Sequence, residues 1–173
     1  GACVGGGLEL ILACHWRIAT RDDATRVGFP EVKLGIFPGF NGTARSIRQA
    51  GPLAAMQAML TGSMIRATAA RGMGLIDELV ASPLNLRWAA RKAVERKRKS
   101  EPAGIAKSVL AKWPARGYLA NKMRSETKKK VREEHYPAPF RLIDLFERHG
   151  SSQDAMKRNE TTAFAPLMVS DTS

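Results

Sequence analysis

The sequence contains few cysteines and histidines, and this scarcity excludes two classes of site. Cys3 and Cys14 are the only cysteines and lack CxxC spacing, so they do not provide a disulfide framework. Their small number favours a reducing compartment. The histidines, His15, His135 and His149, are scattered without HExxH spacing. We therefore expect no metal site built from protein ligands.

Long apolar segments are also missing. The apolar stretch near the start is interrupted by Glu9 and His15, and no run reaches the roughly 18 residues that a membrane-spanning helix needs. The opening has no basic segment ahead of its apolar residues, so it does not resemble a signal peptide. We therefore predict a protein without a membrane span, located in the cytoplasm. Because the chain opens with Gly1 inside a glycine-rich loop, we also expect that an N-terminal stretch is missing.

Positive charge, by contrast, is abundant and unevenly placed. The net charge is +12, and residues 85–134 contain sixteen Lys or Arg against five Asp or Glu. The run RKAVERKRK at 91–99 has three interpretations: a solvated helix face, a contact with coenzyme A phosphates or another acidic partner, or a nucleic-acid contact. Trp88 and Trp113 are too sparse to form a stacking platform for bases, so nucleic acid is the least favoured partner.

The segment GACVGGGLELILAC predicts a strand end, a glycine turn and a helix. Leu8, Ile11 and Leu12 have the i, i+3, i+4 spacing of a helix that is buried on one face. Amides that follow a strand and open a helix favour an anion or a developing oxyanion, although the glycines alone are equally consistent with a tight turn. Glu9 lies in this apolar stretch, where a charge is costly unless it is used or paired; its alternative role is to complement the helix dipole.

The next segment, VGFPEVKLGIFPGFNGT, predicts an extended stretch at 27–36 and a loop at 37–42. Pro30 disfavours a regular central strand in the extended stretch. Thr43 has the position and chemistry of a helix N-cap. Glu31 is the second candidate carboxylate, and simple surface exposure is its alternative interpretation.

The composition changes near residue 83. Glycines and small residues dominate before it, and charged helical patterns dominate after it. We therefore predict a catalytic half at 1–83 and a helical half at 84–173. Helices are expected at 85–99, 140–148 and 153–166, and the final VSDTS is expected to be frayed.

Taken together, these motifs resemble the crotonase (enoyl-CoA hydratase/isomerase) family. The segments that show this resemblance are GGGLELILAC, GFPEVKLGIFPGFNGT and LTGSMIRATAARGMGLIDELV. The later segment, from KSVLAKWPARGYLANKMRSE to RNETTAFAPLMVS, is similar to the region that joins hydratase to dehydrogenase in the multifunctional fatty-acid oxidation α-subunits. The implied fold class is α/β: part of a crotonase (ClpP-like) β-β-α spiral core, followed by a helical linker segment.

The resemblance also implies a site. Glu9 and Glu31 would be the catalytic carboxylates and Gly6 would supply one oxyanion-hole amide, with its partner amide in an earlier segment. The resemblance further places Gly5, Gly7, Pro38 and Gly39 in contact with the substrate. The substrate would be an enoyl-CoA thioester, hydrated or isomerised in fatty-acid β-oxidation. No cofactor is expected in this segment, since NAD would belong to a downstream dehydrogenase domain that is absent, and no GxGxxG is present.

Two residues depart from the family pattern. Asn41 replaces a usual glycine and could alter the loop after Glu31, whereas His15 replaces a common aspartate, and we expect its role to be structural. The implied partners of the longer protein are further copies of itself or a thiolase-containing complex. Two alternatives from other classes stay open: a catalytically incomplete structural fragment, which would explain inactivity of the chain alone, and a basic nucleic-acid-binding module.

Overall fold

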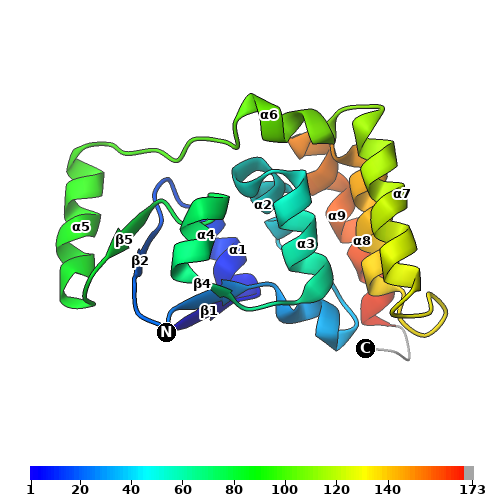
Figure 1. Ribbon diagram of the computed structural model, residues 1–173, viewed down its shortest axis with the longest axis horizontal. Helices are drawn as coiled ribbons and strands as arrows, with labels where there is room; N and C mark the ends of the chain where they lie inside the picture. The colour runs from blue at the N-terminus through cyan, green and yellow to red at the C-terminus, as the bar shows by residue number, and fades with distance from the viewer. Residues whose placement is uncertain (170–173) are drawn as a thin grey trace.

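The computed structural model describes residues 1–169, and in it short strands alternate with helices before residue 83, while helices alone follow (Figure 1). The elements of the first part are β1 (Ala2–Val4), α1 (Gly6–Leu12), β2 (Ile18–Thr20), β3 (Arg26–Gly28), the 3-10 helix η1 (Pro30–Leu34), α2 (Gly42–Ala50), α3 (Pro52–Thr61), β4 (Ile65–Arg66), α4 (Ala67–Met73) and β5 (Glu78–Val80). Those of the second are α5 (Leu84–Glu95), α6 (Ile105–Ser108), the 3-10 helix η2 (Val109–Ala111), α7 (Ala115–Lys128), α8 (Ala138–His149) and α9 (Gln153–Met168).

The strands form two small sheets. In one, β1 pairs in parallel with β3, which pairs antiparallel with β4; in the other, β2 and β5 are parallel. Each parallel pair is connected through helices, as parallel strands require. The β1–β3 pair matters most for the site, because Val4 lies opposite Gly28 and the chain enters α1 and η1 directly beyond these two residues.

The predicted extended stretch at 27–36 is wrong beyond Gly28. Pro30 stands at the first turn of η1, where its missing N–H costs nothing and its fixed φ angle suits a helical start. Gly35 ends this helix in the left-handed conformation, with φ 79°. Thr43 is not the N-cap that the sequence predicts: α2 begins at Gly42, its N-cap is Asn41, and the Thr43 hydroxyl bonds to Glu160 instead.

The helical second half packs on the first half. Helix α9 lies against α2 and α8, and α8 also contacts α3 and α7 (Figure 1). Buried apolar side chains from α1, α2, α3, α7, α8 and α9 belong to a single cluster. The Tyr136 hydroxyl, just before α8, donates to the Val32 carbonyl of η1. The two halves inferred from composition therefore share a core. Ser170 to Ser173 of the predicted frayed end lie outside the described residues.

A buried ion pair joins the second sheet to the turn after α4. The Arg17 guanidinium donates from Nε and Nη2 to the Asp77 carboxylate, at 2.7 and 2.8 Å, and the Arg17 amide donates to the same carboxylate at 2.7 Å. Ser100 adds a hydroxyl bond to Asp77 at 2.8 Å and its amide donates to the His15 carbonyl at 2.7 Å. His15 thus serves the fold through its carbonyl, while its side chain is exposed.

We predict that Asp77→Ala lowers the free energy of unfolding by about 3–5 kcal/mol, because the Arg17 charge, 1% exposed, is left without its partner. The matched control is Asp154→Ala on α9, which removes an exposed ion pair of 3.9 Å and is expected to cost less than about 1 kcal/mol. Urea unfolding followed by circular dichroism measures both, and equal effects would contradict the prediction.

Candidate functional site

The glycine turn between β1 and α1 is the centre of the candidate site. Gly5 has φ 55°, a conformation that side chains disfavour, and its amide donates to the Gly28 carbonyl at 3.0 Å. Its own carbonyl accepts from the Glu9 amide at 3.0 Å. The amides of Gly6 and Gly7 follow at the start of α1, where a helix provides no partner, and both residues are exposed. The Gly5 amide is thus occupied, whereas the Gly6 amide lies at the exposed start of the helix.

Glu9 is held from one side by residues 37–43, which are the loop after η1 together with the first two residues of α2 and are called the loop at 37–43 below. Its side chain is buried, and Oε1 accepts from the amides of Phe40 and Gly42 at 2.9 and 2.8 Å. Burial raises the pKa of the Glu9 carboxyl, while the two amides and the positive charge of Arg45 oppose that rise. A Cβ at position 42 would lie 2.4 Å from Glu9 Oε1, so the contact requires glycine there.

Glu31 lies in the first turn of η1 in a different environment. It is 9% exposed, and in the part of the chain that the structure describes no other residue donates a hydrogen bond to either carboxylate oxygen. Burial, with the negative charge of Glu9 adding to it, raises the pKa of Glu31 to about 7. The carboxylate lies against the glycine turn, since a Cβ on Gly5 would be 3.3 Å from Glu31 Oε1.

The two predicted carboxylates therefore flank the same turn. Glu9 is one turn into the helix that Gly5 precedes, Glu31 contacts Gly5 directly, and the charge of one raises the pKa of the other. Their environments differ, because backbone amides stabilise the Glu9 anion, whereas none of the other described residues donates a hydrogen bond to Glu31. Such asymmetry is typical of pairs in which one carboxyl donates a proton and the other accepts one.

The loop after η1 carries the remaining predicted residues. Pro38 is buried, and the open side of Gly39 is filled by Phe164, whose ring atoms would lie 3.0 Å from a Cβ on Gly39. Asn41 adopts a left-handed conformation with φ 66°. Asparagine is one of the few non-glycine residues that tolerate this conformation, which a glycine would also adopt readily.

Sequence reasoning missed Glu160. It is a buried carboxylate on α9 that accepts from the Asn41 amide and from the Thr43 hydroxyl, more than a hundred residues away in the chain. Burial, with a contribution from the Glu9 charge, raises its pKa to about 7. The helical spacing of α9 contains a signal for this residue. Met156, Glu160 and Leu167 occupy one buried helix face, so Glu160 is a charged residue within an apolar stripe.

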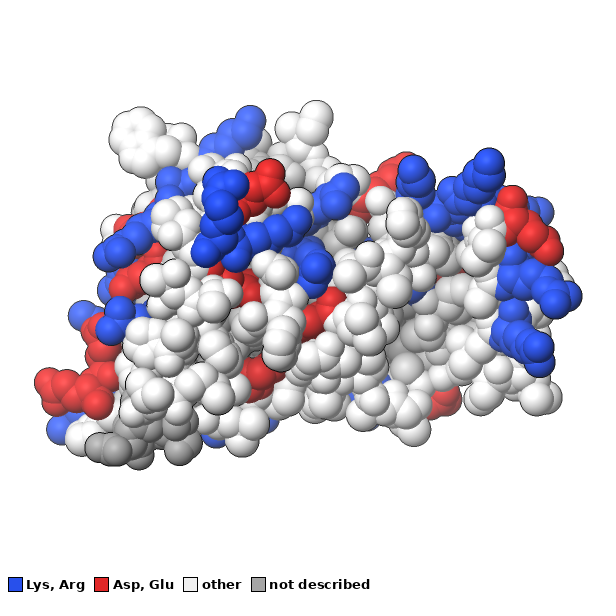
Figure 2. Space-filling model, turned by 180° about the vertical axis from the view of Figure 1, so that it is seen from behind, with Lys and Arg blue, Asp and Glu red and all other residues white. Residues whose placement is uncertain are grey.

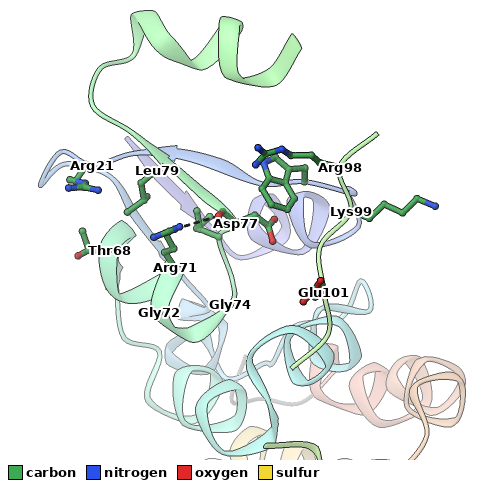
Figure 3. Close-up of a pocket in the computed structure, with 12 residues that line it drawn as sticks. Arg21, Thr68, Arg71, Gly72, Gly74, Asp77, Leu79, Arg98, Lys99 and Glu101 are labelled. Atoms are coloured by element: carbon green, nitrogen blue, oxygen red, sulfur yellow. Dashed lines mark hydrogen bonds between the residues drawn. The ribbon is translucent and has the colours of Figure 1, made fainter. Parts of the chain in front are cut away.

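A polar hollow of about 830 Å³ lies away from these carboxylates, between α4, β5 and the segment after α5 (Figure 3). Its basic side chains are partly engaged within the protein. Arg71 Nε donates to the Asp77 carbonyl at 3.4 Å, and Arg98 pairs with Glu78 at 3.4 Å while its guanidinium lies 5.0 Å from the Trp16 ring centre. Figure 3 also shows Lys99 extending away from Arg71.

The rest of the basic residues form no single continuous patch on the face drawn in Figure 2, where blue and red side chains lie next to each other. In α5, Lys92 lies 4.5 Å from the centre of the Trp88 ring. The role of the 91–99 run therefore stays a prediction, and no observation favours nucleic acid. Within residues 1–169, no three His, Cys, Asp or Glu side chains gather closely enough to hold a metal ion, and no helix is long and apolar enough to cross a bilayer.

Comparisons with known proteins agree with this fold. Residues 1–131 match the enoyl-CoA hydratase/isomerase family. Among solved structures, a carnitinyl-CoA hydratase from Mycobacterium avium is 25% identical, with a TM-score of 0.58 over 99% of this chain and 53% of its own. An enoyl-CoA hydratase from Mycobacterium tuberculosis H37Rv, 22% identical, shares the fold with a TM-score of 0.59 over 98% of this chain and 61% of its own.

Curated relatives extend the match to the whole chain. The chain is 39% identical over 179 residues to the fatty acid oxidation complex subunit alpha of Shewanella sp. (strain MR-4). It is also 39% identical, over 178 residues, to the subunit of the same name from Shewanella putrefaciens (strain CN-32 / ATCC BAA-453). The chain spans a quarter of the length of these relatives. The predicted α/β crotonase fold and the predicted family are confirmed: the chain belongs to the enoyl-CoA hydratase/isomerase family.

Proposed function

We propose that this chain contributes two carboxylates and one oxyanion-hole amide to an enoyl-CoA hydratase site acting in fatty-acid β-oxidation. The observation that carries the proposal is the buried Glu31 carboxyl, which lies against the glycine turn and interacts with the charge of Glu9. Within residues 1–169 it receives no hydrogen bond from another residue. A buried carboxyl with a pKa near neutrality is suited to donate a proton. The relatives described above support the proposal, because they are named as a fatty acid oxidation complex subunit and a carnitinyl-CoA hydratase.

In the proposed reaction, the Gly6 amide and a second amide from an earlier segment polarise the thioester carbonyl. Glu9 takes a proton from water as its oxygen bonds to C3 of the enoyl group. Negative charge moves onto the thioester oxygen, where the amides stabilise it. As the carbonyl re-forms, Glu31 delivers its proton to C2. The net change adds H and OH across the double bond, and the two carboxyls recover their starting states by proton exchange.

The same residues suit a related activity. In an isomerase reaction, Glu31 would carry a proton from C2 to C4. We also propose that Gly5, Gly7, Pro38 and Gly39 lie next to the bound thioester, with Gly39 facing it through its backbone because Phe164 covers its other side. On this proposal the chain needs no cofactor of its own, and any NAD site belongs to a dehydrogenase domain outside it.

For the complete polypeptide, we propose a cytoplasmic enzyme that forms a homo-oligomer or a complex with a thiolase. The Shewanella relatives support the idea of a complex, because they are named as subunits of one. The 173-residue chain by itself is expected to show little hydration activity, because it supplies one of the two oxyanion amides and loss of one such donor typically costs on the order of 10²–10³ in rate.

We predict that Glu31→Gln, made in the complete polypeptide that carries this sequence, lowers kcat for hydration of crotonyl-CoA by about 10²–10⁴, the usual contribution of a general acid. Gln retains the size of the side chain and removes the proton, so the fold should persist. Loss of the double bond, followed by ultraviolet absorbance, measures the rate. Glu101→Gln, at an exposed glutamate of the polar hollow, is the control and should leave kcat unchanged. Near-normal turnover by Glu31→Gln would refute the assignment.

The proton-donor role also predicts how stability depends on pH. The pKa of Glu31 is about 7 in the folded chain, above its ordinary value of 4.5, so the folded state binds the extra proton between these values. The resulting stabilisation is complete below about pH 4.5 and is lost as the pH rises through 7. One pKa unit corresponds to about 1.4 kcal/mol, so Glu31 contributes a loss of up to roughly 3 kcal/mol.

Urea unfolding at pH 5 and pH 8 measures this loss. The unfolding free energy of Glu31→Gln should fall less between the two pH values than that of the unchanged chain. Glu160 titrates in the same range, so the informative quantity is the difference between the two proteins. An identical fall in both would show that Glu31 is already ionised at pH 5.

A further inference from the structure

A third glutamate, Glu160, meets the loop that holds Glu9. It comes from the middle of α9, is 1% exposed, and accepts from the Asn41 amide and the Thr43 hydroxyl. A buried carboxylate is expensive unless its hydrogen bonds are made, so these two bonds are a specific connection between α9 and the loop.

The loop at 37–43 lies between two carboxylates and bonds to them alternately. The amides of Phe40 and Gly42 donate to Glu9, and the intervening amide of Asn41 donates to Glu160. Asn41, whose amide bonds to Glu160, lies between the two amides that bond to Glu9 and has the left-handed conformation, with φ 66°. A non-glycine residue adopts this conformation at a cost, which a strong hydrogen bond at its own amide offsets.

Helix α9 also holds the loop through apolar contact. The Phe164 ring meets the Phe37 ring edge-on, with centroids 5.7 Å apart, and covers Gly39. Phe164 lies four residues after Glu160, on the same helix face. Helix α9 therefore contacts the loop on both sides of Phe40. Phe164 packs against the part before it, and the Glu160 carboxylate bonds to the part after it.

We propose that Glu160 is a positioning residue for the reaction, which fixes the loop at 37–43 so that the amides of Phe40 and Gly42 point at Glu9. This inference rests on the proposed hydratase function. Glu160 does not touch the reacting atoms; it acts through the loop on the water-activating carboxylate. Arg45, which donates to the Phe40 carbonyl at 2.7 Å, supports the same loop from α2.

Two substitutions, one on each partner, weaken the hydrogen bond between Thr43 and Glu160. Glu160→Gln retains the volume but replaces one acceptor oxygen by a donor, and Thr43→Val removes only the hydroxyl. Each should lower kcat for crotonyl-CoA hydration in the complete polypeptide by roughly 10- to 100-fold, the scale of a small displacement of a catalytic group, with KM changed by less than about twofold. Thr43→Ser restores the hydroxyl and should recover most of the lost rate.

The double variant tests whether the two residues act as one unit. Because both single changes break the same contact, Glu160→Gln combined with Thr43→Val should lose little more rate than either alone. Asp154→Asn, at an exposed acid on the same helix, is the matched control and should leave kcat and KM unchanged. Rate losses that multiply, or a Thr43→Ser variant as impaired as Thr43→Val, would overturn the proposal.

A readout that does not need activity separates this inference from the function it rests on. In the 173-residue chain, hydrogen exchange at the Phe40 and Gly42 amides should become faster in Thr43→Val, and in Glu160→Gln if that variant folds. Unchanged exchange at both amides would refute the positioning role.

If instead Glu9→Gln and Glu31→Gln retain near-normal turnover, the hydratase function fails, whatever the exchange at the loop. If Glu31→Gln is inactive and both Glu160→Gln and Thr43→Val are normal, only the positioning role fails.

Discussion

A single buried carboxylate, Glu9, depends on backbone amides from a loop more than thirty residues away. Two amide donors, those of Phe40 and Gly42, offset part of the cost of removing its charge from water. They also orient the carboxylate relative to the glycine turn from which its helix starts. Glycine is needed at position 42 because a Cβ there would occupy the space of the carboxylate. The loop, the helix and the charge are therefore one arrangement, and none of the three would be stable in this form without the others.

The helical second half supports that arrangement from outside. Glu160 of α9 bonds to the loop that holds Glu9, and Tyr136, just before α8, bonds to the 3-10 helix that carries Glu31. Arg124 ties α7 to α8 through Asp144 and Glu147, at 2.8 and 2.5 Å. The second half thus restrains the loop that bonds to Glu9 and the 3-10 helix that carries Glu31. The change in composition near residue 83 separates two kinds of sequence, but the buried cluster extends across it.

The errors of prediction have physical causes. The sequence predicts that Pro30 disfavours a regular strand, but in the structure its fixed φ angle begins a 3-10 helix. Sequence alone does not decide between these two uses of proline. Thr43 has a good N-cap side chain, but its hydroxyl has a stronger acceptor in Glu160, and a charged partner from a distant helix outweighs a local capping bond. The charge run at 91–99 extends past the end of α5 at Glu95, and its contacts depend on neighbours that no local pattern specifies.

The sequence by itself determined the family and the α/β fold class, and it predicts Glu9 and Glu31 as the two carboxylates, because these inferences depend on motifs whose residues are close together in the chain. The glycine turn, the Leu8 and Leu12 face and the position of Glu9 in the first turn of α1 all follow from local spacing. Only the tertiary structure decided that Glu31 is buried with no hydrogen bond from another residue among those described. It also decided that Glu160 reaches the loop that bonds to Glu9. Burial and long-range hydrogen bonds arise from packing between distant segments, so the state of each carboxyl depends on contacts that no short stretch of sequence contains.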